Sequence, residues 1–74
     1  AYYNRALTYS NLKQYDEAVA DFTRSIELND SDVKPYESRA FVYTILGESE
    51  KARKDLRRAK ALGTNIFDYI VDGN

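Results

Sequence analysis

The 74-residue chain lacks the residues on which most enzyme and metal sites depend. It has no cysteine, which excludes disulfide bonds, thiolate metal ligands and a thiol nucleophile. It has no histidine, the commonest metal ligand and the commonest general base at neutral pH. We therefore expect no catalytic residue, no cofactor-binding residue and no metal site, and we predict that the chain is not an enzyme.

Long apolar segments are missing as well. No run approaches the roughly 20 apolar residues that cross a bilayer, and there is no secretory signal peptide. Together with the lack of cysteine, these absences predict a cytoplasmic protein that has no membrane partner. Because the chain begins at Ala1 rather than Met, we expect it to be excised from a longer protein.

The charges of the whole chain are balanced. Eleven basic and 12 acidic residues give a net charge of −1, which shows no overall preference for nucleic acid.

The length allows one small domain, so residues 1–74 are predicted to form a single unit.

The sequence repeats itself at a spacing of 34 residues. Sliding the chain by 34 gives nine identities in 40 aligned pairs, mostly at apolar and small positions. The identical pairs are Tyr2/Tyr36, Arg5/Arg39, Ala6/Ala40, Tyr9/Tyr43, Leu12/Leu46, Ala18/Ala52, Asp21/Asp55, Arg24/Arg58 and Leu28/Leu62. Such a match indicates a repeat architecture.

Each unit is predicted to contain two amphipathic helices. Apolar residues at helical spacing place helices near 2–13, 16–29, 33–46 and 49–62, with a short fifth helix after Asn65. Ser31 or Asp32 can cap the third helix, and Gly47 and Gly63 end the third and fourth in the left-handed conformation. The buried stripes are predicted to contain Tyr2, Ala6, Tyr9, Leu12, Ala18, Phe22, Ser25, Ile26, Tyr36, Ala40, Tyr43, Leu46, Ala52, Leu56 and Ala59.

The period, the small residues at Ala6, Ala18, Ala40 and Ala52, and the segments YDEA and LGESEKA resemble the tetratricopeptide repeat family. The resemblance covers residues 1–62. It implies an all-α fold, an alpha-alpha superhelix of stacked antiparallel helical hairpins. The predicted units are repeat 1 (residues 1–32), repeat 2 (33–64) and a short C-terminal capping or truncated helix (65–74).

The resemblance also implies a non-catalytic scaffold that binds a peptide or helix of a protein partner in a concave groove, which the first helix of each repeat would line. The predicted partner-binding residues are Tyr3, Asn4, Leu7, Asn11, Lys34, Glu37, Ser38, Phe41 and Ile45. The alternative for the apolar members is that they pack between neighbouring first helices.

Asn4 and Lys34 match two positions with which co-chaperones of this family clamp a partner's C-terminal carboxylates. Ser38 stands where the clamp would need an arginine, and arginine makes the strongest carboxylate contact. The sequence therefore favours a structural role for Asn4 over the clamp.

The segment Lys51–Lys60 contains six bases and one acid, Asp55. It raises the alternative that the fourth helix binds nucleic acid or an acidic protein surface. No aromatic residue stands among these bases for stacking, which argues against nucleic acid. Three positions of the second helix are uncharged in the first unit and basic in the second: Val19, Thr23 and Ile26 correspond to Arg53, Arg57 and Lys60. This change instead indicates that the fourth helix forms the polar outer face of a terminal repeat.

Two repeats are fewer than the three or so that usually stabilise such a stack. Self-association through the terminal helices is therefore expected. Its predicted contacts are the first helix and a segment containing Ile66, Phe67, Ile70 and Val71.

Overall fold

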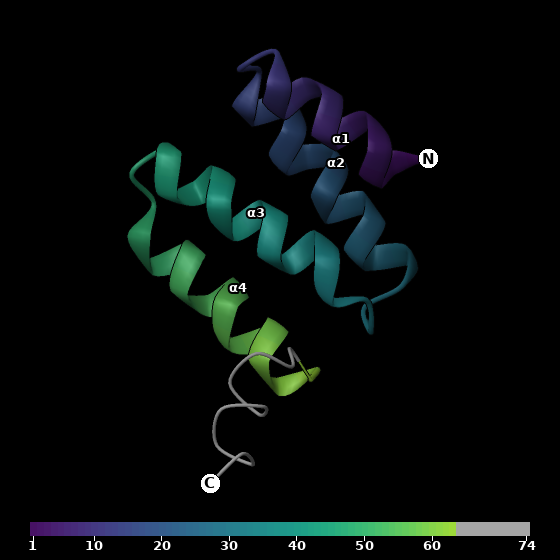
Figure 1. Cartoon of the computed structure of the whole chain (residues 1–74), viewed down its shortest axis with the longest axis vertical. Coiled ribbons are helices and arrows are strands. Elements are labelled where there is room, and N and C mark those ends of the chain that lie inside the picture. The colour runs from purple at the N-terminus through teal and green to yellow at the C-terminus, as the bar shows by residue number, and fades with distance from the viewer. Residues whose placement is uncertain (64–74) are drawn as a thin grey trace, which may run out of the picture.

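The computed structural model describes residues 1–63, which form two helical hairpins side by side (Figure 1). The four helices are α1 (Tyr2–Asn11), α2 (Tyr15–Leu28), α3 (Val33–Ile45) and α4 (Ser49–Ala61). Their ends agree with the predicted ends to within two residues. The predicted fifth helix and the segment containing Ile66, Phe67, Ile70 and Val71 lie outside the described residues.

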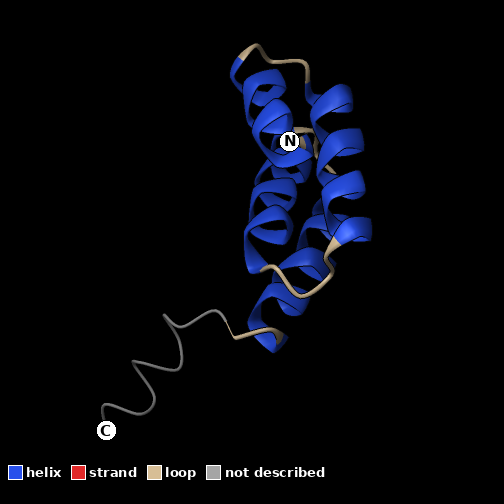
Figure 2. Cartoon of the chain, turned by 90° about the vertical axis from the view of Figure 1, so that its right-hand side faces the viewer, coloured by secondary structure: helices blue, strands red, loops and turns tan. Residues whose placement is uncertain are grey.

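Each helix packs mainly against its neighbours in the chain. The main contacts join α1 to α2, α2 to α3, and α3 to α4. Short loops connect the helices, and residues 1–63 contain no strand (Figure 2). This arrangement confirms the predicted fold class, an all-α stack of antiparallel hairpins.

The alanines predicted at the helix contacts are buried. Ala6 and Ala18 are fully buried, and Ala40 and Ala52 are 2% and 5% exposed. Their small side chains let the paired helices approach closely, and a larger side chain would overpack the contact. Phe22 and Val42 join Ala6 and Ala18 in one core cluster, so this core spans both hairpins.

The helix ends follow the local sequence signals. Asp32 is the N-cap of α3, and its Oδ1 accepts a hydrogen bond from the backbone N–H of Lys34 at 3.1 Å. Gly47 follows α3 with φ of +80° and Gly63 follows α4 with φ of +105°, as predicted for left-handed glycines. Lys13 takes the same region with φ of +62° after α1, in the position that Gly47 occupies one repeat later.

Four predictions of burial are wrong. Tyr2, at the start of α1, is 36% exposed, and Leu46, just after the end of α3, is 40% exposed. Leu12 is 61% exposed because α1 ends at Asn11 and the chain turns at Lys13, which carries Leu12 off the buried stripe. Leu56 is 52% exposed although it aligns with the fully buried Phe22. Phe22 is covered because α3 packs on α2, and within the described residues no helix takes that place against α4.

Candidate functional site

A groove between α1 and α3 is the candidate functional site. Its open pocket has a volume of about 320 Å³. Leu7, Ser10 and Asn11 of α1 line one side, Glu37, Ser38 and Phe41 of α3 line the other, and Phe22 of α2 lies between them. Its volume falls at the lower end of the range of small-ligand sites.

Apolar side chains remain exposed along this groove. Leu7 is 37% exposed and Phe41 is 65% exposed, and both line the pocket. Ile45, one helical turn beyond Phe41, is 46% exposed. The buried cluster of Ala6, Ala18, Phe22 and Val42 contains none of these three side chains.

Tyr3 contacts two pocket-lining residues, Phe22 and Ser38, but does not line the pocket itself. Its ring packs against Phe22 with the ring centres 5.8 Å apart, and its hydroxyl lies 3.4 Å from Ser38 Oγ. Tyr3 therefore links α1 to α3 and is partly buried. Of the predicted binding residues it is the one whose contacts are mostly structural.

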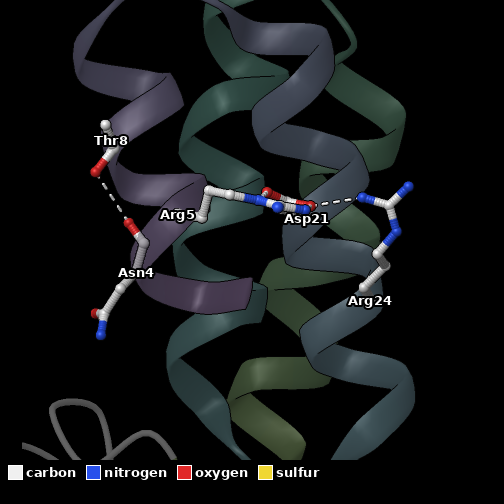
Figure 3. Close-up of polar contacts among 5 residues, drawn as sticks. All are labelled: Asn4, Arg5, Thr8, Asp21 and Arg24. Carbon is white, nitrogen blue, oxygen red and sulfur yellow. Dashed lines mark hydrogen bonds and ion pairs between the residues drawn. The ribbon is translucent and has the colours of Figure 1, made fainter. Parts of the chain in front are cut away.

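The structure thus brings five of the nine predicted residues to the pocket and places four outside it. Asn4 is exposed, its carbonyl accepts a hydrogen bond from Thr8 Oγ1, and its side chain points away from the neighbouring Arg5 (Figure 3). Lys34 is exposed near the N-terminus of α3. The pocket-lining residues are Leu7, Asn11, Glu37, Ser38 and Phe41, and those outside it are Tyr3, Asn4, Lys34 and Ile45.

Two residues of the pocket were absent from the predicted set. Ser10 lies on the same helix face as Leu7 and could have been found from that spacing. Phe22 lies on a second helix, where its spacing marks it as a core residue. Its role under the groove follows only from the packing of α2 against both α1 and α3.

An arginine–aspartate pair joins the two helices of each hairpin, outside the pocket. Arg5 donates to Asp21 through Nε at 2.6 Å and Nη2 at 3.0 Å, and Arg24 adds a third bond to the same carboxylate (Figure 3). Arg39 donates to Asp55 through Nε and Nη2, both at 2.7 Å. In both pairs the aspartate follows the arginine by 16 residues. The sequence could have indicated these ion pairs, because the same arginine and aspartate recur in both repeats.

The carboxylates are buried and depend on these bonds. Asp21 is fully buried and Asp55 is 5% exposed. The hydrogen bond from Arg5 lowers the pKa of Asp21 below its ordinary value; burial opposes this effect and Arg24 adds to it. The hydrogen bond to Asp55 raises the pKa of Arg39 against the opposing effect of burial. These ion pairs hold the two helices of each hairpin together.

Within residues 1–63, no three acidic side chains gather in a way that could hold a metal ion. No helix of that part combines the length and the apolar content needed to cross a bilayer.

Comparison with known proteins gives the family. The model described as "Tetratricopeptide repeat" matches residues 1–32. Similar proteins include Sperm-associated antigen 1 of Homo sapiens, 34% identical over 71 residues, and a FAM10 family protein of Arabidopsis thaliana, 38% identical over 61 residues. Protein unc-45 homolog B of Mus musculus is 33% identical over 61 residues. No solved structure matches the chain significantly.

These matches cover most of the chain and little of its relatives. The match to Sperm-associated antigen 1 spans 96% of the chain and 8% of that relative. The FAM10 family protein and Protein unc-45 homolog B each match 82% of the chain, which is 14% of the first relative and 7% of the second. Repeats of the matched family generally mediate protein–protein interactions and are generally non-catalytic. With this match over residues 1–32 and a helical hairpin in each 34-residue unit, the chain belongs to the tetratricopeptide repeat family.

Proposed function

We propose that the groove between α1 and α3 binds an extended or helical peptide segment of a protein partner, and that the chain acts as a non-catalytic scaffold. The observation that carries the proposal is the pocket of about 320 Å³ whose two rims carry the exposed side chains of Leu7 and Phe41. Exposed apolar side chains beside a concave, partly polar surface are typical of recognition sites.

The chemistry of the groove indicates how the segment would be held. Leu7 and Phe41 offer apolar area for one anchoring side chain of the partner, and Ile45 extends that area along α3. Asn11 and Ser38 supply neutral hydrogen-bonding groups for the partner's backbone. Asn4 and Lys34 lie outside the pocket, so they would contact only flanking residues of the partner.

The affinity should come mainly from the apolar anchors. Exposed charges contribute little each, whereas a few well-packed side chains dominate most interfaces. Losing the Phe41 ring should therefore weaken binding by at least about tenfold, which corresponds to about 1.4 kcal/mol.

The test is selection of 12-residue peptides from a random display library on the immobilised chain, followed by calorimetric titration of the selected peptide. Phe41→Ser should weaken binding of that peptide by at least tenfold, and Arg57→Ser on α4 should leave it unchanged. Both side chains are exposed, so neither change should unfold the domain. Equal affinity for the Phe41→Ser variant and the unmodified chain would contradict the groove proposal.

The basic face of α4 supports a second candidate, the binding of an acidic protein surface. The only acid between Lys51 and Lys60 is Asp55, which is buried and paired with Arg39, whereas the six bases are exposed. Binding through this face would fall steeply as salt rises, and Arg57→Ser would weaken it. A selected ligand that behaves in this way would favour α4 over the groove.

A further inference from the structure

The two helices that line the groove carry few charged side chains. In α1 there is only Arg5, and α3 adds Lys34, Glu37 and Arg39. The two arginines bond to aspartates of α2 and α4, and these ion pairs do not line the pocket. The charge of the groove therefore depends mainly on Lys34 and Glu37.

These two residues have different places relative to the pocket. Glu37 lines it together with the neutral Ser10, Asn11 and Ser38, whereas Lys34 lies outside it. Within the described chain, Glu37 is thus the one charged side chain of the pocket wall, and it is exposed. A ligand in the pocket meets a negatively charged hydrogen-bond acceptor there and no cation.

The ring of Phe41 lies beside this carboxylate. Glu37 and Phe41 are four residues apart on α3, so their Cβ atoms lie about 5–6 Å apart on one face of the helix. Phe41 is 65% exposed, and the face of an aromatic ring attracts a cation. The chain makes such a contact itself at the same spacing, since the guanidinium of Arg39 lies 5.6 Å from the ring centre of Tyr43. The carboxylate and the ring together offer two favourable contacts to one basic side chain.

An acidic side chain finds no equivalent contact in the pocket. A carboxylate placed there would face Glu37, and like charges brought together at an interface lower the affinity. Ser38 offers only a neutral hydroxyl, which lies 3.4 Å from the hydroxyl of Tyr3. The wall of the groove thus distinguishes between ligands by the sign of their charge.

We infer that the groove selects a peptide segment in which a basic residue stands beside the apolar anchor, and that it rejects segments with an acidic residue there. The inference rests on the proposed function, since it names the chemistry of the segment that the groove binds. An extended chain advances about 3.3 Å per residue, so the basic residue would stand one or two residues from the anchor. In a helical segment it would stand one turn away. The anchor supplies most of the affinity, and the charge decides which partner is bound.

The first test reads the peptides that the unmodified chain selects from the random library. Lysine and arginine should be enriched, and aspartate and glutamate depleted, within two residues or one helical turn of the apolar anchor. The unselected library is the reference. Enrichment of acidic residues at these places, or no preference for either charge, would overturn the inference.

The second test exchanges charges between the chain and a selected peptide, with calorimetric titration as the measurement. Glutamate in place of the peptide's basic residue should weaken binding to the unmodified chain by about fivefold, because an attraction becomes a repulsion. The Glu37→Lys variant should instead bind the glutamate peptide more tightly than the basic one. Glu27→Lys on α2 is the matched control, because it changes the net charge equally outside the pocket. It should keep the preference for the basic peptide.

Folding of these variants is checked by circular dichroism, which should stay helical because both glutamates are exposed. If Glu37→Lys unfolds, Glu37→Gln replaces it and should reduce the preference for the basic peptide. A preference that either folded variant leaves unchanged refutes the inference.

The outcomes also separate this inference from the groove proposal. If Phe41→Ser weakens binding of the selected peptide but Glu37→Lys does not alter the charge preference, the inference fails and the groove proposal stands. If Phe41→Ser has no effect, the groove proposal itself fails. If an acidic peptide with a free C-terminal carboxylate binds more tightly than the basic peptide, and Lys34→Ala abolishes its binding, the groove holds carboxylates through Lys34 and the inference is wrong.

Discussion

Lys13 and Gly47 make a matched pair for measuring backbone strain in this fold. They are 34 residues apart, each follows the first helix of its repeat, and both are left-handed, with φ of +62° and +80°. The left-handed region costs a residue with a side chain about 1–2 kcal/mol. Glycine avoids that cost but loses about 0.5–1 kcal/mol more conformational entropy on folding.

The difference between the strain of a left-handed side-chain residue and the entropy cost of glycine sets the expected change in the free energy of unfolding. Lys13→Gly should stabilise the domain by about 0.5–1 kcal/mol, and Gly47→Ala should destabilise it by a similar amount. A Cβ at Gly47 would meet no atom within 4 Å, so its cost comes from the backbone conformation alone. In a domain of this size, about 1 kcal/mol shifts the melting temperature by about 4–8 °C.

Thermal unfolding followed by circular dichroism is the measurement, and Lys13→Ala is the control. That variant removes the lysine side chain and keeps the left-handed strain, so its melting temperature should stay near that of the unmodified chain. The reasoning is refuted if Lys13→Gly lowers the melting temperature, or if Lys13→Ala raises it as much as Lys13→Gly does.

Three further predictions concern the packing and the ion pairs. Ala40→Leu should overpack the contact of α3 with α4 and lower the free energy of unfolding by about 1–3 kcal/mol, a loss that urea titration would detect. Asp55→Asn weakens the bidentate bonding of Arg39 and should cost about 1.5–3 kcal/mol in the same assay, and a cost below 0.5 kcal/mol would contradict the importance of the pair. Asp21 has a lowered pKa, so its contribution to stability is present above the ordinary value of 3.8 and lost as the pH falls through the folded-state pKa. Acid unfolding should follow that direction, and Asp21→Asn should flatten the dependence on pH below about pH 4.

Much of the groove could be predicted from the sequence because the residues that share one face of a helix recur at a fixed spacing. Leu7 and Asn11 fall on one face of α1, and Ser38 and Phe41 on the equivalent face of α3, and all four line the pocket. Tyr3 shares the face of Leu7 but is held by Phe22 and Ser38, which lie on other helices. Whether such a residue stays available to a partner depends on contacts between helices, which the spacing along one helix cannot supply.

The sequence by itself determined the local structure and the repeat of this protein. The 34-residue period specifies two hairpins, the alanines mark where paired helices touch, and Asp32 and Gly47 act within one or two turns of their own positions. Only the tertiary structure decided which apolar side chains become buried. Phe22 and Leu56 have equivalent positions, yet one is fully buried and the other is 52% exposed. Burial requires a neighbouring helix: α3 packs on α2 and covers Phe22, whereas among residues 1–63 no later helix packs on α4 in the same way. The ion pairs between helices have the same origin, since a spacing of 16 residues becomes a contact only after the hairpin has formed.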